Sequence, residues 1–300
     1  MNLPTLRQLQ YLVAVVELRH FGQAAEHCFV TQSTLSAGIQ ELENLLGATL
    51  IERSKRKVLP TPLGIEIAGR AQQLLDLATE MTEMADSQGK PLSGTLRLGV
   101  IPTIGPYLLP KVLPGIRSGF PDLELQLVED QSGRLLERLG RGTLDTAILA
   151  FPYPVGEMER SIFWEEKFLV ALPSDHSLAR RKRLATGELP REELLLLEEG
   201  HCMTDHALAA CHLEGLKSNA AFQGTSLYTL LQMVAGGQGI TFLPEMANRS
   251  ELLPPEGIRL AALTETGPHR QIGLVWRNTY YRKEDLLTLA EEMGRLLQAG

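Results

Sequence analysis

The 300-residue chain has three cysteines, 5% aromatic residues and no long hydrophobic run. Cys28, Cys202 and Cys211 are too few and too scattered for the disulfide scaffold of a small secreted domain. The absence of any run of about 18 apolar residues argues against a membrane-spanning helix. The N-terminus also lacks the basic and then apolar pattern of a signal peptide. We therefore expect a cytoplasmic chain without membrane attachment, in which any disulfide would be a regulated one.

Basic charge is also scarce, because the formal net charge is -7. This balance argues against a protein whose whole surface binds nucleic acid. Residues 1–60 nevertheless hold six basic against five acidic side chains, and four of the six lie close together: Arg53, Lys55, Arg56 and Lys57. The cluster indicates a local anion-binding feature, although a solvated basic loop would explain the run by itself.

The first 60 residues predict short helices followed by a hairpin. Apolar residues recur at helical spacing over 6–16, and Phe21–Glu26 predicts a second short helix. Thr31 can cap a third helix, which Gly47 would end. Two short extended pieces, 49–53 and 57–61, then flank the basic turn. This order is typical of a winged helix-turn-helix.

The third helix has a polar N-terminal end formed by Gln32, Ser33, Thr34 and Ser36. Small amide and hydroxyl side chains on a helix can reach base edges in the major groove, while a basic hairpin contacts phosphates beside it. We therefore expect Gln32, Ser33, Thr34, Ser36, Arg53, Lys55 and Arg56 to contact double-stranded promoter DNA. A three-helix protein-interaction bundle is the alternative.

A longer helix follows, in which apolar residues alternate at spacings of four and three: Ile67, Ala71, Leu74, Ala78, Met81 and Ala85. Such a heptad pattern favours a close helix pair between subunits, with packing on its own domain as the alternative. A Gly/Pro/Ser-containing stretch then breaks the helix. We expect a DNA-binding domain over 1–62, a dimerisation helix over 63–86, a hinge over 87–93 and a regulatory domain over 94–300.

The regulatory region alternates strands and helices, which predicts two parallel α/β lobes. Strands are expected at 94–101, 123–128 and 146–150 in the first lobe. The second lobe is expected to begin at 168–172 and to continue through 194–197, a helix from about Thr204, and 221–222, 226–235 and 239–243. The chain then returns through 271–276 and a final helix over 284–297. Two such lobes would place a ligand cleft between the carboxyl ends of their strands.

Several segments carry a family resemblance. Residues 21–26, 30–36, 39–43, 50–53 and 59–64 resemble the DNA-binding module of LysR-type transcriptional regulators, and residues 236–244 are similar to the effector domain of that family. The resemblance implies a winged helix-turn-helix, a linker helix, a two-lobed regulatory domain of the periplasmic-binding-protein type, and a dimer of dimers. It also implies RNA polymerase as a partner and a transcriptional rather than an enzymatic role.

Residues 197–211, together with 101–110 and 225–227, resemble the hydrogen peroxide-sensing subgroup of this family, which controls oxidative-stress genes. The resemblance implies that Cys202 is the peroxidatic thiol, that Cys211 resolves it, and that a thiol reductase resets the disulfide. It further assigns peroxide binding or thiol activation to Thr103, Ser132, His201, Asp205 and Arg270. Ser132 stands where the subgroup more often has threonine.

The chemistry of this segment is consistent with a redox switch. Peroxide oxidises a thiolate to a sulfenic acid, which a second thiol captures as a disulfide. The predicted helix N-terminus after Cys202, together with His201 and Arg270, would favour the thiolate. If residues 204–212 are helical, the two cysteine Cα atoms lie about 13 Å apart, whereas a disulfide needs less than about 7 Å. Oxidation would therefore partly unwind the helix.

Other interpretations remain open. His201, Cys202, His206, Cys211 and His212 offer enough ligands for zinc, but neighbouring side chains on a helix point in different directions, so we expect no metal and no cofactor. The two thiols could be buried and never meet. The protein could instead be a LysR-type regulator responding to a metabolite in the cleft, or a thiol peroxidase, although the DNA-binding module argues against an enzyme. Cys28 is expected in a core, and the remaining histidines on the surface or in loops: His20, His27, His176 and His269.

Overall fold

The computed structural model describes residues 3–53, 58–86, 90–198, 203, 206, 226–248 and 256–299. The chain divides into two compact units, Met1–Gly89 and Lys90–Gly300. Each unit has its own hydrophobic core. Within the described ranges, no helix is both long enough and apolar enough to span a bilayer.

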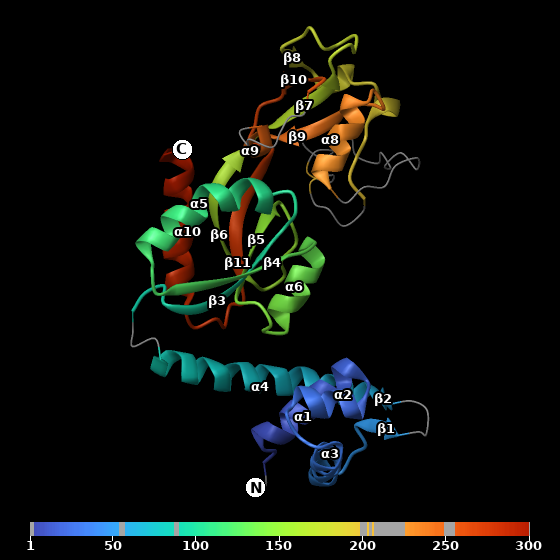
Figure 1. Ribbon diagram of the computed structural model, residues 1–300, viewed down its shortest axis with the longest axis vertical. Coiled ribbons are helices and arrows are strands. Elements are labelled where there is room, and N and C mark those ends of the chain that lie inside the picture. The colour runs from blue at the N-terminus through green and yellow to red at the C-terminus, as the bar shows by residue number, and fades with distance from the viewer. Residues whose placement is uncertain are drawn as a thin grey trace. The chain divides into compact units, whose positions relative to one another are not determined.

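The first unit is a helix-turn-helix followed by a two-stranded wing and a long helix (Figure 1). Its elements are α1 (Leu6–Leu18), α2 (Phe21–His27), α3 (Gln32–Leu46), β1 (Ile51–Arg53), β2 (Val58–Pro60) and α4 (Pro62–Asp86). The wing strands are antiparallel, with Ile51 opposite Pro60 and Arg53 opposite Val58. The expected winged helix-turn-helix is confirmed.

Local sequence signals account for the ends of α3. The Thr31 side chain accepts a hydrogen bond from the Thr34 amide at 3.2 Å and thereby satisfies one of the free N–H groups at the helix start. At the other end, Gly47 adopts φ of 65°, the left-handed conformation that glycine reaches without steric cost. Both ends lie where the sequence predicted them.

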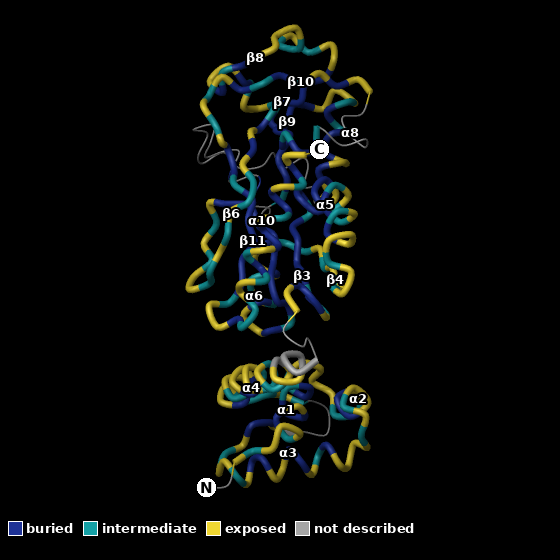
Figure 2. The backbone as a smooth tube through the Cα atoms, turned by 90° about the vertical axis from the view of Figure 1, so that its left-hand side faces the viewer, coloured by how far each residue is buried: buried dark blue, intermediate teal, exposed yellow. Residues whose placement is uncertain are grey.

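Helix α4 buries part of its predicted seam within its own unit. It packs along α1, and Ala71 is only 2% exposed in the core of the first unit. The expectation that Ala71 faces a partner subunit is therefore wrong at this residue. Leu74, Leu77 and Met81, spaced three and four residues apart, are exposed instead. Figure 2 shows exposed and intermediate residues along α4. A narrower apolar stripe than predicted is thus available to a second subunit.

The second unit contains two sheets and their covering helices (Figure 1). The first lobe comprises β3 (Gly94–Val100), α5 (Gly105–Gly119), β4 (Leu123–Glu129), α6 (Ser132–Gly140), β5 (Thr146–Phe151), β6 (Glu159–Glu166), β11 (Arg270–Trp276) and α10 (Lys283–Ala299). The second lobe comprises β7 (Phe168–Pro173), β8 (Arg183–Leu184), the short helices η1 (Thr186–Glu188) and η2 (Arg191–Glu193), α8 (Leu227–Ala235), β9 (Thr241–Pro244), α9 (Glu245–Asn248) and β10 (Ile258–Leu263).

The first sheet has the strand order β4-β3-β5-β11-β6. Strands β4, β3 and β5 are parallel as predicted, but β11 runs antiparallel to both β5 and β6. This reversal arises because β11 brings the chain back from the second lobe, whereas β6 leads the chain out to it. Strand β6 was not predicted from the sequence, because its residues are half-exposed and largely polar, as suits an edge strand.

The second sheet corrects the prediction of a second parallel unit. Strand β7 pairs antiparallel with both β9 and β10, and the one parallel pairing among the named strands of this sheet joins β10 to the two-residue β8. Residues 194–197 contribute an isolated bridge between Leu194 and Ile240, and they are buried in the core. The predicted strand at 221–222 lies outside the described residues.

Candidate functional site

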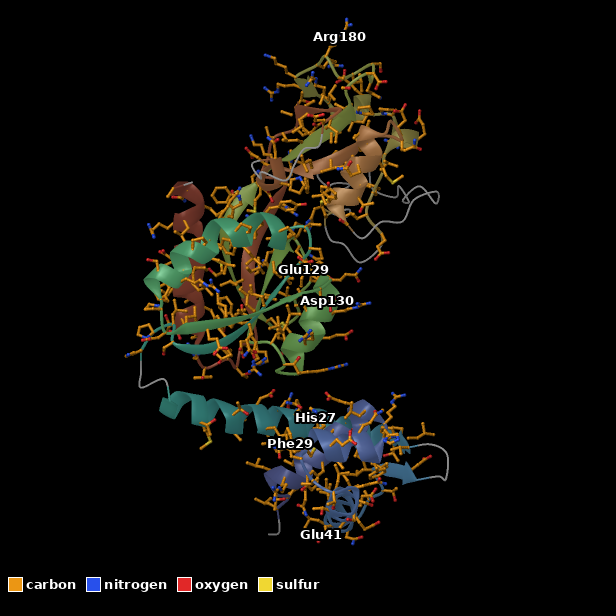
Figure 3. All side chains as sticks on the ribbon, viewed as in Figure 1. His27, Phe29, Glu41, Glu129, Asp130 and Arg180 are labelled. Atoms are coloured by element: carbon orange, nitrogen blue, oxygen red, sulfur yellow. The ribbon has the colours of Figure 1, made fainter. Side chains whose placement is uncertain are left out.

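The carboxyl ends of the parallel strands meet at one edge of the first sheet. Val100 of β3 pairs with Glu129 of β4 and with Ile148 of β5. Strand β11 begins at this same edge, since Gln271 is the partner of Phe151 at the end of β5. The loops after β3, β4 and β5 and the first residue of β11 are therefore neighbours. Figure 3 labels Glu129, the last residue of β4, and Asp130, which follows it at this edge. Three predicted site residues lie at this edge: Thr103, Ser132 and Arg270.

Thr103 and Ser132 present buried hydroxyl groups at this edge. Thr103 is 2% exposed and follows β3, while Ser132 is 1% exposed and begins α6. Ser132 Oγ has no hydrogen-bond partner among the residues that the structure describes. Buried polar groups are usually paired, so a buried hydroxyl with no partner among the described residues is an unusual feature that a small polar ligand would satisfy.

Arg270 is a fully buried cation with a partner that the sequence analysis missed. Its Nε and Nη2 each lie 2.6 Å from Oε1 of Glu166, whose side chain is also buried. Its Nη1 lies 3.4 Å from Thr103 Oγ1, and its Nη2 lies 3.2 Å from the Thr103 carbonyl oxygen. No local pattern pointed to Glu166, because the pairing spans 104 residues of sequence.

Tyr107 adds a neutral phenol to the same surroundings. It lies on α5 and is 5% exposed. Burial raises the pKa of Tyr107 to about 12, against a smaller opposing effect of the Arg270 charge. The Tyr107 side chain therefore stays protonated and cannot supply a counter-charge to Arg270.

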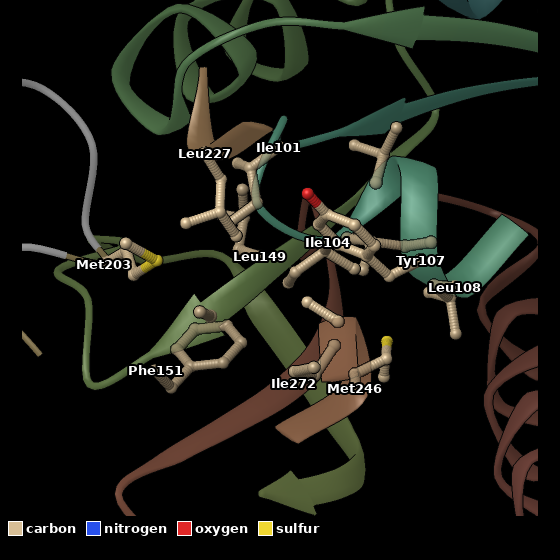
Figure 4. Packing of buried hydrophobic residues seen from close by; sticks show 14 of the residues in the cluster. Ile101, Ile104, Tyr107, Leu108, Leu149, Phe151, Met203, Leu227, Met246 and Ile272 are labelled. Atoms are coloured by element: carbon tan, nitrogen blue, oxygen red, sulfur yellow. The ribbon is translucent and has the colours of Figure 1, made fainter. Parts of the chain in front are cut away.

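The predicted switch residues lie outside the described residues: His201, Cys202, Asp205 and Cys211. Two residues of the same segment are described. Met203 is 2% exposed and belongs to the apolar cluster that also includes Phe151 and Leu227 (Figure 4). His206 Nε2 lies 2.7 Å from the carbonyl oxygen of Pro152, directly after β5. Both residues thus attach to the sheet edge that holds Thr103, Ser132 and Arg270.

His269 is a further buried group beside Arg270. It lies in a loop as expected, but it is 7% exposed rather than on the surface. Its Nδ1 accepts a hydrogen bond from the Phe168 amide at 2.8 Å, and the two rings stack with centroids 6.1 Å apart. Burial lowers the pKa of His269, so the neutral imidazole is favoured.

The N-terminal end of α3 is the candidate DNA interface. Gln32, Ser33 and Thr34 are exposed, whereas Leu35 on the same helix is fully buried. Thr31 Oγ1 lies 2.9 Å from Ser33 Oγ and 2.8 Å from Thr34 Oγ1, so these hydroxyls form one small hydrogen-bonded group. The fourth predicted contact on this helix, Ser36, is partly buried.

The wing is attached to α3 by a buried carboxylate that the sequence analysis did not identify. Glu43 Oε1 accepts hydrogen bonds from the Leu50 amide at 2.7 Å and from the Ile51 amide at 3.0 Å. The backbone of Arg53 ends β1, but its side chain lies outside the described residues, as do Lys55 and Arg56. Cys28 packs against the core of this unit as expected, and burial raises the pKa of its thiol.

Comparisons with known proteins agree with this architecture. The family model described as bacterial regulatory helix-turn-helix protein, lysR family, matches residues 6–65, and the model of the LysR substrate binding domain matches residues 89–298. A hydrogen peroxide-inducible genes activator of Haemophilus influenzae is 44% identical over 273 residues, which cover 91% of this chain and 90% of that protein.

Solved structures give the same result. A full-length OxyR variant from Pseudomonas aeruginosa has a TM-score of 0.78 and 34% identity, covering 97% of this chain and 98% of that one. An H2O2-bound OxyR mutant of Corynebacterium glutamicum has a TM-score of 0.67 and 36% identity, covering 99% of this chain and 94% of that one. The chain therefore belongs to the LysR family of DNA-binding transcriptional regulators, within its OxyR group.

Proposed function

We propose that this protein is a transcriptional regulator that senses hydrogen peroxide through reversible formation of a Cys202–Cys211 disulfide and thereby controls oxidative-stress genes. The observation that carries the proposal is the convergence of Thr103, Ser132 and Arg270 at one sheet edge. Met203, the chain neighbour of Cys202, is buried in the apolar cluster at this edge. The relatives named as peroxide-inducible activators support the choice of ligand.

The proposed reaction begins with the Cys202 thiolate. Sulfur attacks one peroxide oxygen, the S–O bond forms as the O–O bond breaks, and the departing hydroxide takes up a proton to become water. Sulfur is oxidised by two electrons and peroxide is reduced by two. The Cys211 thiol then displaces the sulfenic oxygen, so an S–S bond forms and a second water leaves.

The other site residues would support these steps. Thr103 and Ser132 offer hydroxyl groups to the peroxide oxygens, and Arg270 supplies a fixed positive charge nearby. His201 and Asp205 would hydrogen-bond to the reacting groups or stabilise the thiolate. A small, uncharged and strongly hydrogen-bonding ligand suits a pair of buried hydroxyls better than a large metabolite does, because buried polar groups need partners.

The output is expected at promoter DNA. The exposed end of α3 would contact base edges, and Arg53, Lys55 and Arg56 would contact phosphates. The exposed stripe of Leu74, Leu77 and Met81 on α4 would pair two subunits, and two such dimers would form the tetramer. We infer RNA polymerase and a thiol reductase as further partners. We also infer that the regulator is cytoplasmic, needs no cofactor or metal, and is not an enzyme.

The decisive experiment is peptide mapping after near-stoichiometric peroxide, with expression of a reporter gene followed in parallel. We expect a Cys202–Cys211 disulfide in the parent protein. Cys202→Ser should lose the whole response, whereas Cys211→Ser should still consume one equivalent of peroxide and stop at a sulfenic acid that dimedone traps. Cys28→Ser is the matched control and should respond like the parent. Oxidation of Cys211 first, or a full reporter response in Cys202→Ser, would contradict the proposal and favour a metabolite-responsive regulator.

A further inference from the structure

Glu166 and Arg270 lie where the chain crosses between the two lobes. Glu166 is the last residue of β6, and Lys167 alone separates it from β7 in the second lobe. Arg270 is the first residue of β11, through which the chain returns, and the two residues are register partners in the first sheet. Figure 1 shows both crossings side by side between the two sheets.

Each carboxylate oxygen of Glu166 has a different partner. Oε1 binds the Arg270 guanidinium at 2.6 Å, and Oε2 accepts a hydrogen bond from the Met246 amide of α9 at 2.7 Å. The Glu166 carbonyl oxygen also accepts a hydrogen bond from the His269 amide at 2.9 Å. The Glu166 side chain, which is 1% exposed, is therefore held by both the returning strand and the second lobe. A carboxylate fixed on both oxygens in turn fixes the guanidinium that it binds.

The position of Arg270 determines how Thr103 can hydrogen-bond. A guanidinium has donors and no acceptor, so Nη1 can interact with Thr103 Oγ1 only by donating to it. The hydroxyl proton of Thr103 must then point away from Arg270. Because the guanidinium is positively charged, it also makes this hydroxyl a stronger donor. The pair thus converts Thr103 into a hydrogen-bond donor with a defined direction.

We propose that Glu166 is a positioning residue for peroxide reduction, because it holds Arg270 so that the Thr103 hydroxyl donates a hydrogen bond to the departing oxygen of the peroxide. The inference rests on the proposed function. When the thiolate attacks, negative charge develops on the departing oxygen as the O–O bond breaks. A donor that is already oriented lowers the barrier, since no group has to reorganise during the reaction.

The test compares two reactions of the Cys202 thiol in the full-length protein. One is oxidation by hydrogen peroxide, and the other is alkylation by iodoacetamide, which needs the thiolate but breaks no O–O bond. Alkylation measured across pH gives the thiolate fraction, so the peroxide rate constant can be expressed per thiolate. For Glu166→Gln we expect this corrected constant to fall roughly tenfold, less than the loss of a whole oxyanion donor. The corrected rate constant of Glu166→Asp should lie between those of the parent and of Glu166→Gln.

Asp145→Asn is the matched control. Asp145 is another buried carboxylate in an arginine pair, with its Oδ1 2.8 Å from Arg97 Nη2, but it precedes β5 and so lies at the opposite end of that strand. The Asp145→Asn substitution should lower thermal stability without changing the corrected rate constant. A second check is non-additivity: in a Thr103→Val background, Glu166→Gln should cause little further loss, because the donor is already absent.

The outcomes separate the two proposals. If the parent protein is oxidised at Cys202 but Glu166→Gln and Glu166→Asp keep the parent's corrected rate constant, the positioning role is wrong and the proposed function stands. If the parent is not oxidised at Cys202, both are wrong. Glu166→Gln could fail to fold because it leaves Arg270 buried without a counter-charge. In that case the corrected rate constant of Glu166→Asp, compared with that of the parent, decides whether Glu166 has the positioning role.

Discussion

Thr103 and Ser132 occupy equivalent positions after neighbouring parallel strands, because each lies three residues beyond a paired strand end, Val100 in β3 and Glu129 in β4. The two hydroxyls differ in their surroundings. Thr103 Oγ1 accepts from Arg270, whereas Ser132 Oγ has no partner among the described residues. Arg270 therefore orients one hydroxyl, whereas no described residue orients the other.

Ser132→Ala should slow oxidation by peroxide without lowering stability. Removing a buried hydroxyl that makes no hydrogen bond within the described structure relieves an unmet polar group, so the free energy of unfolding should stay constant or rise by about 1 kcal/mol. Stopped-flow oxidation and thermal unfolding check the two parts. Thr146→Val is the control, because Thr146 Oγ1 donates to the Val275 carbonyl oxygen at 3.0 Å. The control should lose stability and keep its rate; an unchanged rate in Ser132→Ala would remove Ser132 from the peroxide site.

Changes at the start of α3 should alter which DNA sequences are bound. Gln32→Ala combined with Ser33→Ala removes exposed side chains that can reach base edges, so the footprint and the preferred operator should change. Asn44→Ala, about three turns further along the helix, is the control and should leave the preference intact. Wild-type footprints from the double variant would exclude this end of α3 from the major groove.

Arg53→Ala should weaken binding to all DNA sequences alike. A side chain that contacts phosphate releases a counterion on binding, so its loss should reduce the slope of log K against log salt concentration by about one. Titrations at several salt concentrations measure this slope for specific and for random DNA. A loss confined to the specific operator would instead indicate that Arg53 reads bases.

Two glutamate substitutions on α4 should have opposite effects on folding and assembly. Met81 is 72% exposed, so Met81→Glu should dissociate subunits while the first unit stays folded. Ala71 is buried against its own unit, so Ala71→Glu should destabilise that unit by several kcal/mol through an unpaired buried charge. Sedimentation and thermal unfolding distinguish the two. Unchanged oligomers in both Met81→Glu and Leu77→Glu would show that this stripe is not the subunit contact.

Protonation of His269 should make the free energy of unfolding depend on pH in the weakly acidic range. Its pKa is lowered from 6.5 by burial, so the unfolded chain takes up a proton at a higher pH than the folded chain. The resulting contribution to the free energy of unfolding is complete above about pH 6.5 and is lost as the pH falls through the lower folded pKa.

Replacement by glutamine tests this dependence. In His269→Gln the amide oxygen can still accept from the Phe168 amide, but the side chain no longer titrates. Denaturant unfolding between pH 5 and pH 8 should therefore show a shallower acid slope than the parent, whereas the exposed control His27→Gln should keep the parent's slope. Equal slopes in all three proteins would mean that His269 does not contribute.

The sequence by itself determined the DNA-binding unit and the strands of the regulatory unit whose residues are mostly apolar. The Thr31 cap, the apolar face of α3 and the glycine end at Gly47 act over one or two helical turns, so their effect can be read from neighbouring residues. The predicted strands at 94–101, 146–150 and 271–276 were also located correctly, because strands have characteristic apolar patterns: Leu96, Leu98 and Val100 alternate along the first strand, and residues 147–150 form a short apolar run.

Only the tertiary structure decided which residues meet. Three features depend on segments that are distant in the sequence: the pairing of Glu166 with Arg270, the antiparallel direction of β11, and the burial of Ala71 in the core of the first unit. A side-chain pattern along one segment reports which face is apolar, but it does not specify which partner covers that face. For the same reason the resemblance named Thr103, Ser132 and Arg270, whereas the buried Glu166 that binds Arg270 is brought to it only by the pairing of the two strands that cross between the lobes.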